Sequence, residues 1–227
     1  MGGKVNFVGE LDQLLLNFKE TNNYQKEDFY VSKSNFFAYK LLDSWPNWEK
    51  NIINIHGEKY CGKSHLTEIF IKKNKGIIFD AKTFKFTDQK ELKLYQNIII
   101  DNFNDDIDEK SIFSLINFID QNSKYLIINS TRPINKISFK LKDLISRSKN
   151  CLEAKINEPD DELIKVLIVK NLSDKQVIID EKLINFVVKR IPRSYGKIFE
   201  FIYKIDEISL KKKKSIDQKI IKEVLGK

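Results

Sequence analysis

The chain has 227 residues, is 41% hydrophobic and 32% charged, and carries a formal net charge of +8, as is typical of a soluble protein with one or two domains. It has no apolar run of the roughly 20 residues that a membrane span needs, and it has no secretory signal. Its two cysteines form no disulfide framework, and with only two histidines a Cys/His zinc site is not expected. We therefore expect a cytoplasmic location. Lysine supplies nearly all of the positive charge, whereas base readout favours arginine, so we expect any contact with DNA to be indirect or weak.

Residues 1–27 are polar and are expected to be mobile, except for the apolar stretch LDQLLLNF at 11–18. On its own this stretch fits two structures. It could form the first turns of a helix packed on the protein's own core. It could also be a short peptide offered to a partner, in which the Gln13 amide binds a polar rim while Leu14, Leu16 and Phe18 fill an apolar pocket.

Between residues 28 and 157, short apolar strands alternate with helical segments. The extended DFYVS leads into helical spacing between residues 35 and 42, and WPNW at 45–48 ends that segment. Strands are predicted at 51–57, 76–81, 97–101 and 125–130, and helices at 63–73, 90–95 and 111–121. Since continuous apolar strands that alternate with helices are typical of a buried parallel sheet, the sequence predicts an α/β domain with helices on both faces.

After NEPDD at 157–161 the strands stop. Helical segments are predicted at about 160–171, 180–190, 194–209 and 215–225, with acidic residues in the first turn of the first one. The lysine run at 211–214 is interpreted as a solvated connection between two of these helices. We therefore expect a flexible segment at 1–27, an α/β domain at 28–157 and a small all-helical domain at 158–227.

The segment GEKYCGKS at 57–64 fits the phosphate-loop pattern G-x-x-x-x-G-K-[ST], between a predicted strand and a predicted helix. Gly57 and Gly62 allow conformations that residues with a Cβ avoid, and the loop N–H groups then face a polyphosphate. Lys63 is expected to reach the β- and γ-phosphates, and Ser64 to place its hydroxyl on Mg²⁺. The motif predicts ATP or ADP with Mg²⁺ as cofactor, bound by Gly57, Lys59, Tyr60, Cys61, Gly62, Lys63, Ser64 and His65.

Two residues later in the sequence, and one inside the loop, bear on the chemistry. Asp101 ends the strand NIIID, where open α/β sheets place ligand groups, and is predicted to be the Mg²⁺-associated carboxylate, although it could also cap a turn. Asn102 stands where an ATPase of this layout usually has an acid that orients the attacking water, and an amide cannot act as a base. Cys61, inside the loop, is interpreted as a small packing residue rather than a nucleophile. The sequence thus predicts nucleotide binding with weak hydrolysis by this chain alone.

Together these motifs resemble the DnaA/Hda family of AAA+ ATPases, and within it the regulatory Hda branch. The matching stretches are EDFYVSKSN (27–35), SWPNW (44–48), GKSHL (62–66), IIIDN (98–102), RP (132–133), LKDLISR (141–147) and NEPDDELIKVL (157–167). The resemblance runs from about residue 11 to the end and implies a P-loop AAA+ domain followed by a helical lid. The sequence ends after this lid, with no room for the origin-binding helix-turn-helix domain of DnaA, so we expect a regulator rather than an initiator.

The resemblance also implies roles for two segments outside the phosphate loop. Residues 13–18 resemble the peptide by which such proteins dock on the replicative sliding clamp, the β subunit of DNA polymerase III, with Asn17 where a Pro is often found. The clamp-binding residues would be Gln13, Leu14, Leu16 and Phe18. Arg147 stands where the family has its arginine finger, which acts in trans on ATP bound to the neighbouring DnaA. An ordinary surface arginine or a structural ion pair is the alternative for Arg147.

Further nucleotide contacts are implied by the family pattern, with departures. Phe29, Val31 and Asn35 match the segment that frames adenine, although core packing suits Phe29 equally. Thr131 stands where the family often has Asp and can donate a hydrogen bond toward a γ-phosphate. The lid's sensor arginine aligns with a glycine, Gly196, and Arg193 is the nearest substitute, unless it is an ordinary surface arginine. These departures favour a nucleotide-bound, poorly hydrolysing protein that rests with ADP.

The sequence therefore predicts a regulator of replication initiation that binds the sliding clamp and promotes hydrolysis of DnaA-bound ATP. Self-association or homodimer formation with ADP, burying or exposing Arg147, is an expected form of regulation. Two alternatives stay open: a self-sufficient P-loop ATPase acting in nucleic-acid remodelling or helicase loading, and a non-catalytic adaptor whose nucleotide is structural.

Overall fold

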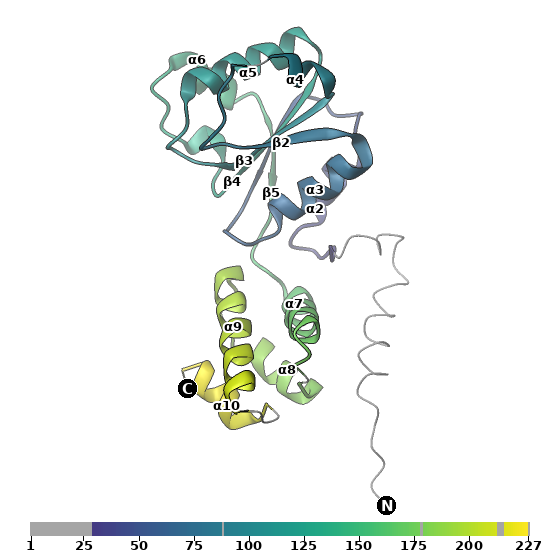
Figure 1. The fold of residues 1–227 in the computed structure, drawn as a ribbon, viewed down its shortest axis with the longest axis vertical. Helices are drawn as coiled ribbons and strands as arrows, with labels where there is room; N and C mark the ends of the chain where they lie inside the picture. Colours follow the sequence, from purple (N-terminus) through teal and green to yellow (C-terminus); the bar gives the residue numbers. More distant parts are fainter. Residues whose placement is uncertain (1–28, 88, 178, 213–215, 227) are drawn as a thin grey trace, which may run out of the picture. The chain divides into compact units, whose positions relative to one another are not determined.

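A computed structural model describes residues 29–87, 89–177, 179–212 and 216–226. Its centre is a five-stranded, entirely parallel sheet with the strand order β2-β3-β4-β1-β5 (Figure 1). This confirms the predicted α/β fold with a parallel sheet. The strands are β1 (Ile52–His56), β2 (Gly76–Asp80), β3 (Asn97–Phe103), β4 (Tyr125–Ser130) and β5 (Leu152–Lys155).

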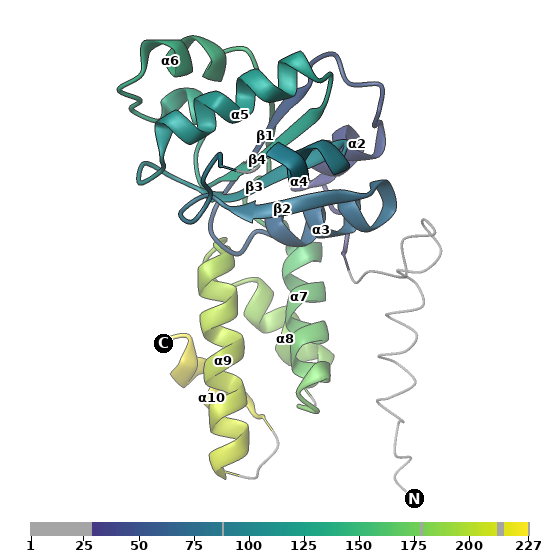
Figure 2. The same ribbon diagram turned by 45° about the horizontal axis from the view of Figure 1, so that its top comes forward.

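Helices cover both faces of this sheet. Helices α2 and α3 lie on one face, and α4, α5 and α6 lie on the other (Figure 2). The N-terminus of α5 is fixed by a side-chain cap, because the Asp108 carboxylate accepts a hydrogen bond from the Ser111 N–H. The helices of this unit are α2 (Phe36–Asp43), α3 (Lys63–Asn74), α4 (Gln89–Leu94), α5 (Glu109–Gln121) and α6 (Lys142–Ser148), with a short 3₁₀ turn at Ile134–Lys136.

The apolar runs in the sequence reflect burial on both faces of the inner strands. All five residues of β1 are buried, as are the first four of β3 and the last five of β4. Strand β5 was not predicted from the sequence, because its four residues, LEAK, form a short edge strand in which only Ala154 is fully buried. The face toward α5 holds the larger apolar cluster, which includes Ile98, Ile100, Leu115, Ile119, Leu126 and Ile128.

The C-terminal part of the chain is helical, as the loss of strand patterns predicted. The described chain divides into two compact units, with one division between Asp160 and Asp161. Residues Arg193–Lys197 group with the α/β unit, so α9 begins there. The helical unit has its own apolar core, to which Ile168, Leu172, Val187 and Ile205 contribute. Its helices are α7 (Asp161–Asp174), α8 (Glu181–Val188) and α10 (Gln218–Val224). Helix α9 (Tyr195–Lys212) belongs to this unit from Ile198 onward.

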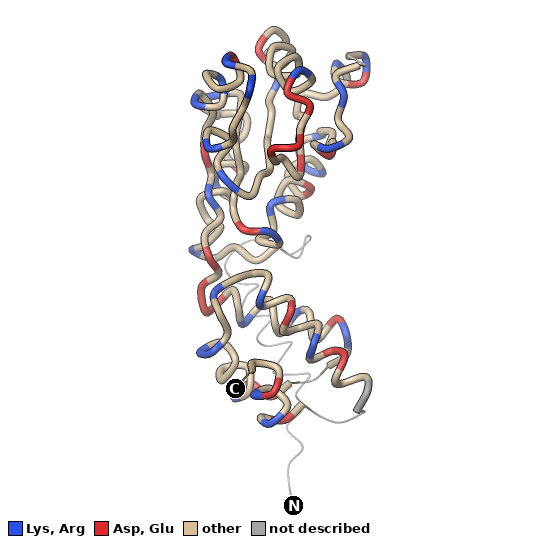
Figure 3. The backbone as a smooth tube through the Cα atoms, turned by 90° about the vertical axis from the view of Figure 1, so that its left-hand side faces the viewer, with Lys and Arg blue, Asp and Glu red and all other residues tan. Residues whose placement is uncertain are grey.

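Charged residues of both signs are interspersed along the described backbone (Figure 3). The view shows no long stretch of Lys and Arg without acidic residues nearby. In the described part of the chain, no helix combines the length and apolar character that a membrane crossing requires.

Candidate nucleotide-binding site

The phosphate loop lies at the carboxyl edge of the sheet, directly after β1. Strand β1 pairs with β4 on one side and β5 on the other. The chain leaves β1 toward β2 and leaves β4 toward β5, in opposite directions, so this edge is a topological switch point, where open α/β sheets bind ligands. The Gly57 N–H donates to the Ser130 carbonyl over 3.3 Å and joins the loop to the end of β4.

The two motif glycines are needed for different reasons. Gly62 has φ = 94°, in the left-handed region, and is the N-cap of α3. Gly57 is needed for space instead: a Cβ there would lie 2.7 Å from the Ile156 carbonyl oxygen and 3.0 Å from the Cys61 sulfur. The expectation that both glycines serve loop conformation therefore holds for Gly62, while Gly57 allows close packing against the segment after β5.

We expect Gly57→Ala to lower the free energy of unfolding by about 2 kcal/mol, because the backbone oxygen of Ile156 cannot move aside easily. Gly196→Ala is the matched control. A Cβ at Gly196, in the first turn of α9, would meet nothing closer than 3.5 Å, so this variant should be about 0.5 kcal/mol more stable than the wild type. Urea unfolding of both variants measures the difference, and equal effects would contradict the packing argument.

Lys63 lies at the start of α3, and its ammonium folds back over the loop. Its Nζ donates to the carbonyls of Gly57 and Glu58, both over 2.9 Å. Burial raises the pKa of the Cys61 thiol, and the Lys63 ammonium, 3.5 Å from the sulfur, offsets this only in part. The thiol is therefore held protonated, which suits a packing residue. Of the other loop residues, Lys59 lies 5.1 Å from the centroid of the exposed Tyr60 ring, and Ser64 and the exposed His65 continue the first turn of α3.

Glu58, which the sequence analysis did not single out, links the phosphate loop to the start of α9. Its carboxylate accepts hydrogen bonds from the Tyr195 N–H at 3.0 Å and the Gly196 N–H at 3.3 Å, and a third from the Ser194 hydroxyl. The Glu58 side chain thus serves as the N-terminal cap of α9. Because Glu58 occupies a variable position of the motif, only its folded position reveals this role.

Asp101, near the carboxyl end of β3, is linked to Thr67 of α3 by two hydrogen bonds through Asn129. The amide Nδ2 of Asn129 donates to Asp101 Oδ1 and to Thr67 Oγ1, each over 3.0 Å. The Thr67 hydroxyl in turn contacts the Ser64 carbonyl at 3.0 Å. The structure therefore brings together the two residues predicted to serve the metal, Ser64 and Asp101, through two residues that the sequence analysis missed.

Thr131, the residue predicted to contact the γ-phosphate, is exposed one position beyond the end of β4. The buried Asn129, two residues earlier on β4, contacts Asp101, and the sequence analysis did not single it out. A buried asparagine within an apolar strand is a signal that sequence analysis could have used, because polar groups in such positions almost always have a partner.

Asn102 adopts a left-handed backbone conformation with φ = 57°, at an irregularity in the pairing of β3 with β4. Its Nδ2 donates to Asp80 Oδ2, at the end of β2, over 2.7 Å. The pKa of the Asp80 carboxyl is lowered mainly by this hydrogen bond. The amide of Asn102 is thus oriented by a carboxylate on the neighbouring strand and supplies no base itself.

Arg147, in the last turn of α6, forms an ion pair with Asp120. Its guanidinium also lies 5.8 Å from the centroid of the Phe113 ring. Asp120 and Phe113 both belong to α5, and the Arg147 side chain is 37% exposed. The ion pair foreseen as the alternative for Arg147 is therefore present, and the guanidinium remains partly accessible to a partner.

The other predicted site residues have the following surroundings. Asn35 is buried, and its Oδ1 accepts from the Ser32 N–H at 2.9 Å, while Phe29 and Val31 are half-buried. Arg193 is exposed and contacts the Pro159 carbonyl over 3.5 Å. The clamp-peptide residues Gln13, Leu14, Leu16 and Phe18 lie outside the described residues.

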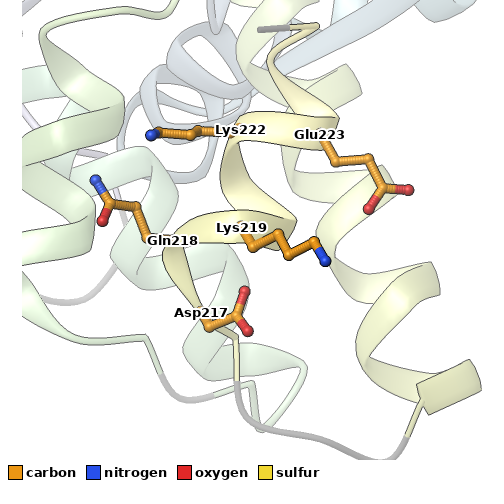
Figure 4. A pocket seen from close by; sticks show the side chains of 5 residues that line it. All are labelled: Asp217, Gln218, Lys219, Lys222 and Glu223. Atoms are coloured by element: carbon orange, nitrogen blue, oxygen red, sulfur yellow. The ribbon is translucent and has the colours of Figure 1, made fainter.

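A hollow at the surface of α10 is unrelated to these motifs. Its lining consists of polar and charged side chains from one short helix and the residue before it, pointing in different directions (Figure 4): Asp217, Gln218, Lys219, Lys222 and Glu223.

Comparisons with known proteins address the fold. No protein-family model matches the chain. An uncharacterized protein of Haemophilus influenzae is 25% identical over 229 residues, which cover 94% of this chain and 98% of that protein. Domain III of the replication initiation protein DnaA from Thermotoga maritima superposes with a TM-score of 0.73 and 23% identity, over 88% of this chain and 94% of that one.

Other solved structures have the same architecture. DnaA from Aquifex aeolicus bound to AMPPCP has a TM-score of 0.64 and 21% identity, over 86% of this chain and 68% of that one. A point mutant of RuvB from Thermotoga maritima has a TM-score of 0.66 and 13% identity, over 87% and 70%. The parallel sheet and the helical region after it thus form the AAA+ α/β fold that is shared by domain III of DnaA and by RuvB.

Proposed function

We propose that the chain binds ATP or ADP with Mg²⁺ at the phosphate loop. The observation that carries this proposal is the placement of Gly62, Lys63, Ser64 and Asp101 at one edge of the sheet, where Asn129 and Thr67 link Asp101 to the helix that follows the loop. Loop N–H groups and Lys63 would hold the phosphates, and Ser64 and Asp101 would serve the cation. The binding of AMPPCP by a DnaA of the same fold supports this proposal.

We further propose that the chain is a cytoplasmic regulator of replication initiation of the Hda type. It would promote hydrolysis of ATP bound to DnaA by presenting Arg147 in trans, while docked on the sliding clamp through residues 13–18. The likeness to DnaA domain III and the partly accessible guanidinium support this role. The amide at Asn102 supports weak hydrolysis by the chain itself, which disfavours a self-sufficient ATPase.

A binding experiment with the sliding clamp tests the docking peptide. We expect the full-length chain to bind the immobilised clamp. Gln13→Ala should weaken this binding at least tenfold, because it removes the amide that would hydrogen-bond to the polar rim of the clamp pocket. Gln25→Ala changes a glutamine outside the motif and should bind as the wild type does. Equal binding by all three proteins would assign the apolar stretch at 11–18 to another role.

A further inference from the structure

We propose that Asn129 is a positioning residue of the nucleotide site, with its amide oxygen as an acceptor for a water molecule bound to the nucleotide's divalent cation. The inference rests on the proposed nucleotide binding and extends it to a residue outside the phosphate-loop motif. Asn129 is the residue before the last one of strand β4 and is fully buried.

The donor side of Asn129 fixes the orientation of its amide. Nδ2 donates to Asp101 Oδ1 and to Thr67 Oγ1, at 3.0 Å each. An ionised carboxylate can only accept, and the Thr67 hydroxyl donates its single hydrogen to the carbonyls of Lys63 and Ser64, at 3.2 and 3.0 Å. A reversed amide would place an oxygen against two acceptors, so the nitrogen must face Asp101 and Thr67.

No described residue donates to the acceptor side of the same amide. Asn129 Oδ1 is buried and has no hydrogen-bond partner among the described residues. Buried amide oxygens are rarely left in this state, and a bound water or ligand usually satisfies them. The Asn129 side chain lies beside the residues that would serve the cation. It contacts Asp101, which is half-buried and therefore reachable by water. Through Thr67 it is also linked to the backbone carbonyl of Ser64.

These contacts give Asn129 two effects on one ligand. Its Nδ2 links the Asp101 carboxylate to Thr67 of α3, and its Oδ1 would complete a polar shell of the kind that surrounds hydrated Mg²⁺. Loss of the side chain should therefore weaken the contribution of the cation to nucleotide binding, and leave the contacts between the phosphates and the loop intact.

The chain offers a closely matched control. Asn97 is also fully buried, and its Oδ1 likewise has no hydrogen-bond partner in the described part of the chain. Its Nδ2 donates to the carbonyls of Asn74 and Lys75. It is the first residue of β3, at the amino end of the strand, whereas Asp101 and Asn129 lie toward the carboxyl ends of β3 and β4. The same substitution at the two positions separates an effect on the site from the general cost of removing a buried asparagine.

The test measures the affinity for a fluorescent ADP analogue by titration, once with Mg²⁺ and once with EDTA. We expect the wild type to bind more tightly with Mg²⁺. Asn129→Ala should reduce this Mg²⁺-dependent gain about tenfold while the affinity in EDTA stays within twofold. Asn97→Ala should keep the wild-type gain. Thr67→Val, which is isosteric and removes the hydroxyl that fixes Asn129, should give an intermediate gain.

The outcomes separate the two proposals. A wild-type Mg²⁺-dependent gain in Asn129→Ala, or an equal loss with Mg²⁺ and with EDTA, overturns the role of Asn129 and leaves nucleotide binding intact. If Asn129→Ala does not fold, Thr67→Val decides, and a wild-type gain in that variant overturns the inference. A wild-type protein that binds no nucleotide overturns the proposed function and, with it, this inference.

Discussion

Arg147→Ala is expected to reduce the acceleration of ATP turnover on DnaA by a factor of about 10³, in an assay with clamp loaded on DNA. An arginine supplied in trans stabilises the charge that develops on the transferred phosphoryl group, and its loss has effects of this size. The same substitution should change the stability of the chain itself by only about 0.5 kcal/mol, because the ion pair with Asp120 is partly exposed.

The control for this prediction is Arg190→Ala. Arg190 also lies against an aromatic ring, with its guanidinium 3.8 Å from the centroid of Phe186, and it donates to the Phe186 carbonyl. Arg190 belongs to the helical unit, so Arg190→Ala should leave the turnover of DnaA-bound ATP unchanged. Full stimulation by Arg147→Ala would exclude the finger and support a non-catalytic adaptor. If the wild-type chain has no effect on the turnover of DnaA-bound ATP, the regulator proposal is wrong.

Lys63→Ala is expected to weaken nucleotide binding about 100-fold, measured by titration with ADP and ATP. The Lys63 ammonium lies over the loop, 2.9 Å from two of its carbonyls, and is placed to form charge-assisted hydrogen bonds with phosphate oxygens. A loss of about 3 kcal/mol corresponds to two orders of magnitude in the dissociation constant.

Lys59→Ala removes the same charge from the same loop and separates local contact from general electrostatics. The Lys59 side chain is directed to the ring of Tyr60, which is exposed, so this variant should bind nucleotide within about threefold of the wild type. A similar loss in both variants would mean that the net charge of the loop, rather than the position of Lys63, determines affinity. Thermal unfolding without nucleotide shows whether the loop of Lys63→Ala remains folded.

The fold could be predicted from the sequence because its inner strands are buried on both faces. The runs before His56, Asp101 and Ser130 consist largely of isoleucine and leucine, as is typical of short strands that are buried on both faces. Strand β5 escaped prediction because an edge strand of four residues carries too little pattern, and its pairing with β1 defines it instead.

The candidate site was predictable only where a motif fixes the chemistry. Gly62 and Lys63 follow from the loop pattern, since a left-handed cap and a phosphate-binding ammonium each need one residue type. Glu58 and Asn129 could not be assigned in the same way, because their roles depend on partners far away in sequence. Glu58 and its partner Tyr195 are 137 residues apart in the sequence, and Asn129 and its partner Asp101 are 28 residues apart.

The three hydrogen bonds that the Glu58 carboxylate accepts at the start of α9 have a thermodynamic consequence. Since one carboxylate both belongs to the phosphate loop and caps this helix, the free energy of ordering the first turn of α9 is linked to the conformation of the loop. Linkage of this kind is reciprocal: a ligand that favours the capped loop favours the ordered helix start by the same amount. The amides of Tyr195 and Gly196 are accordingly natural reporters of the loop's conformational equilibrium.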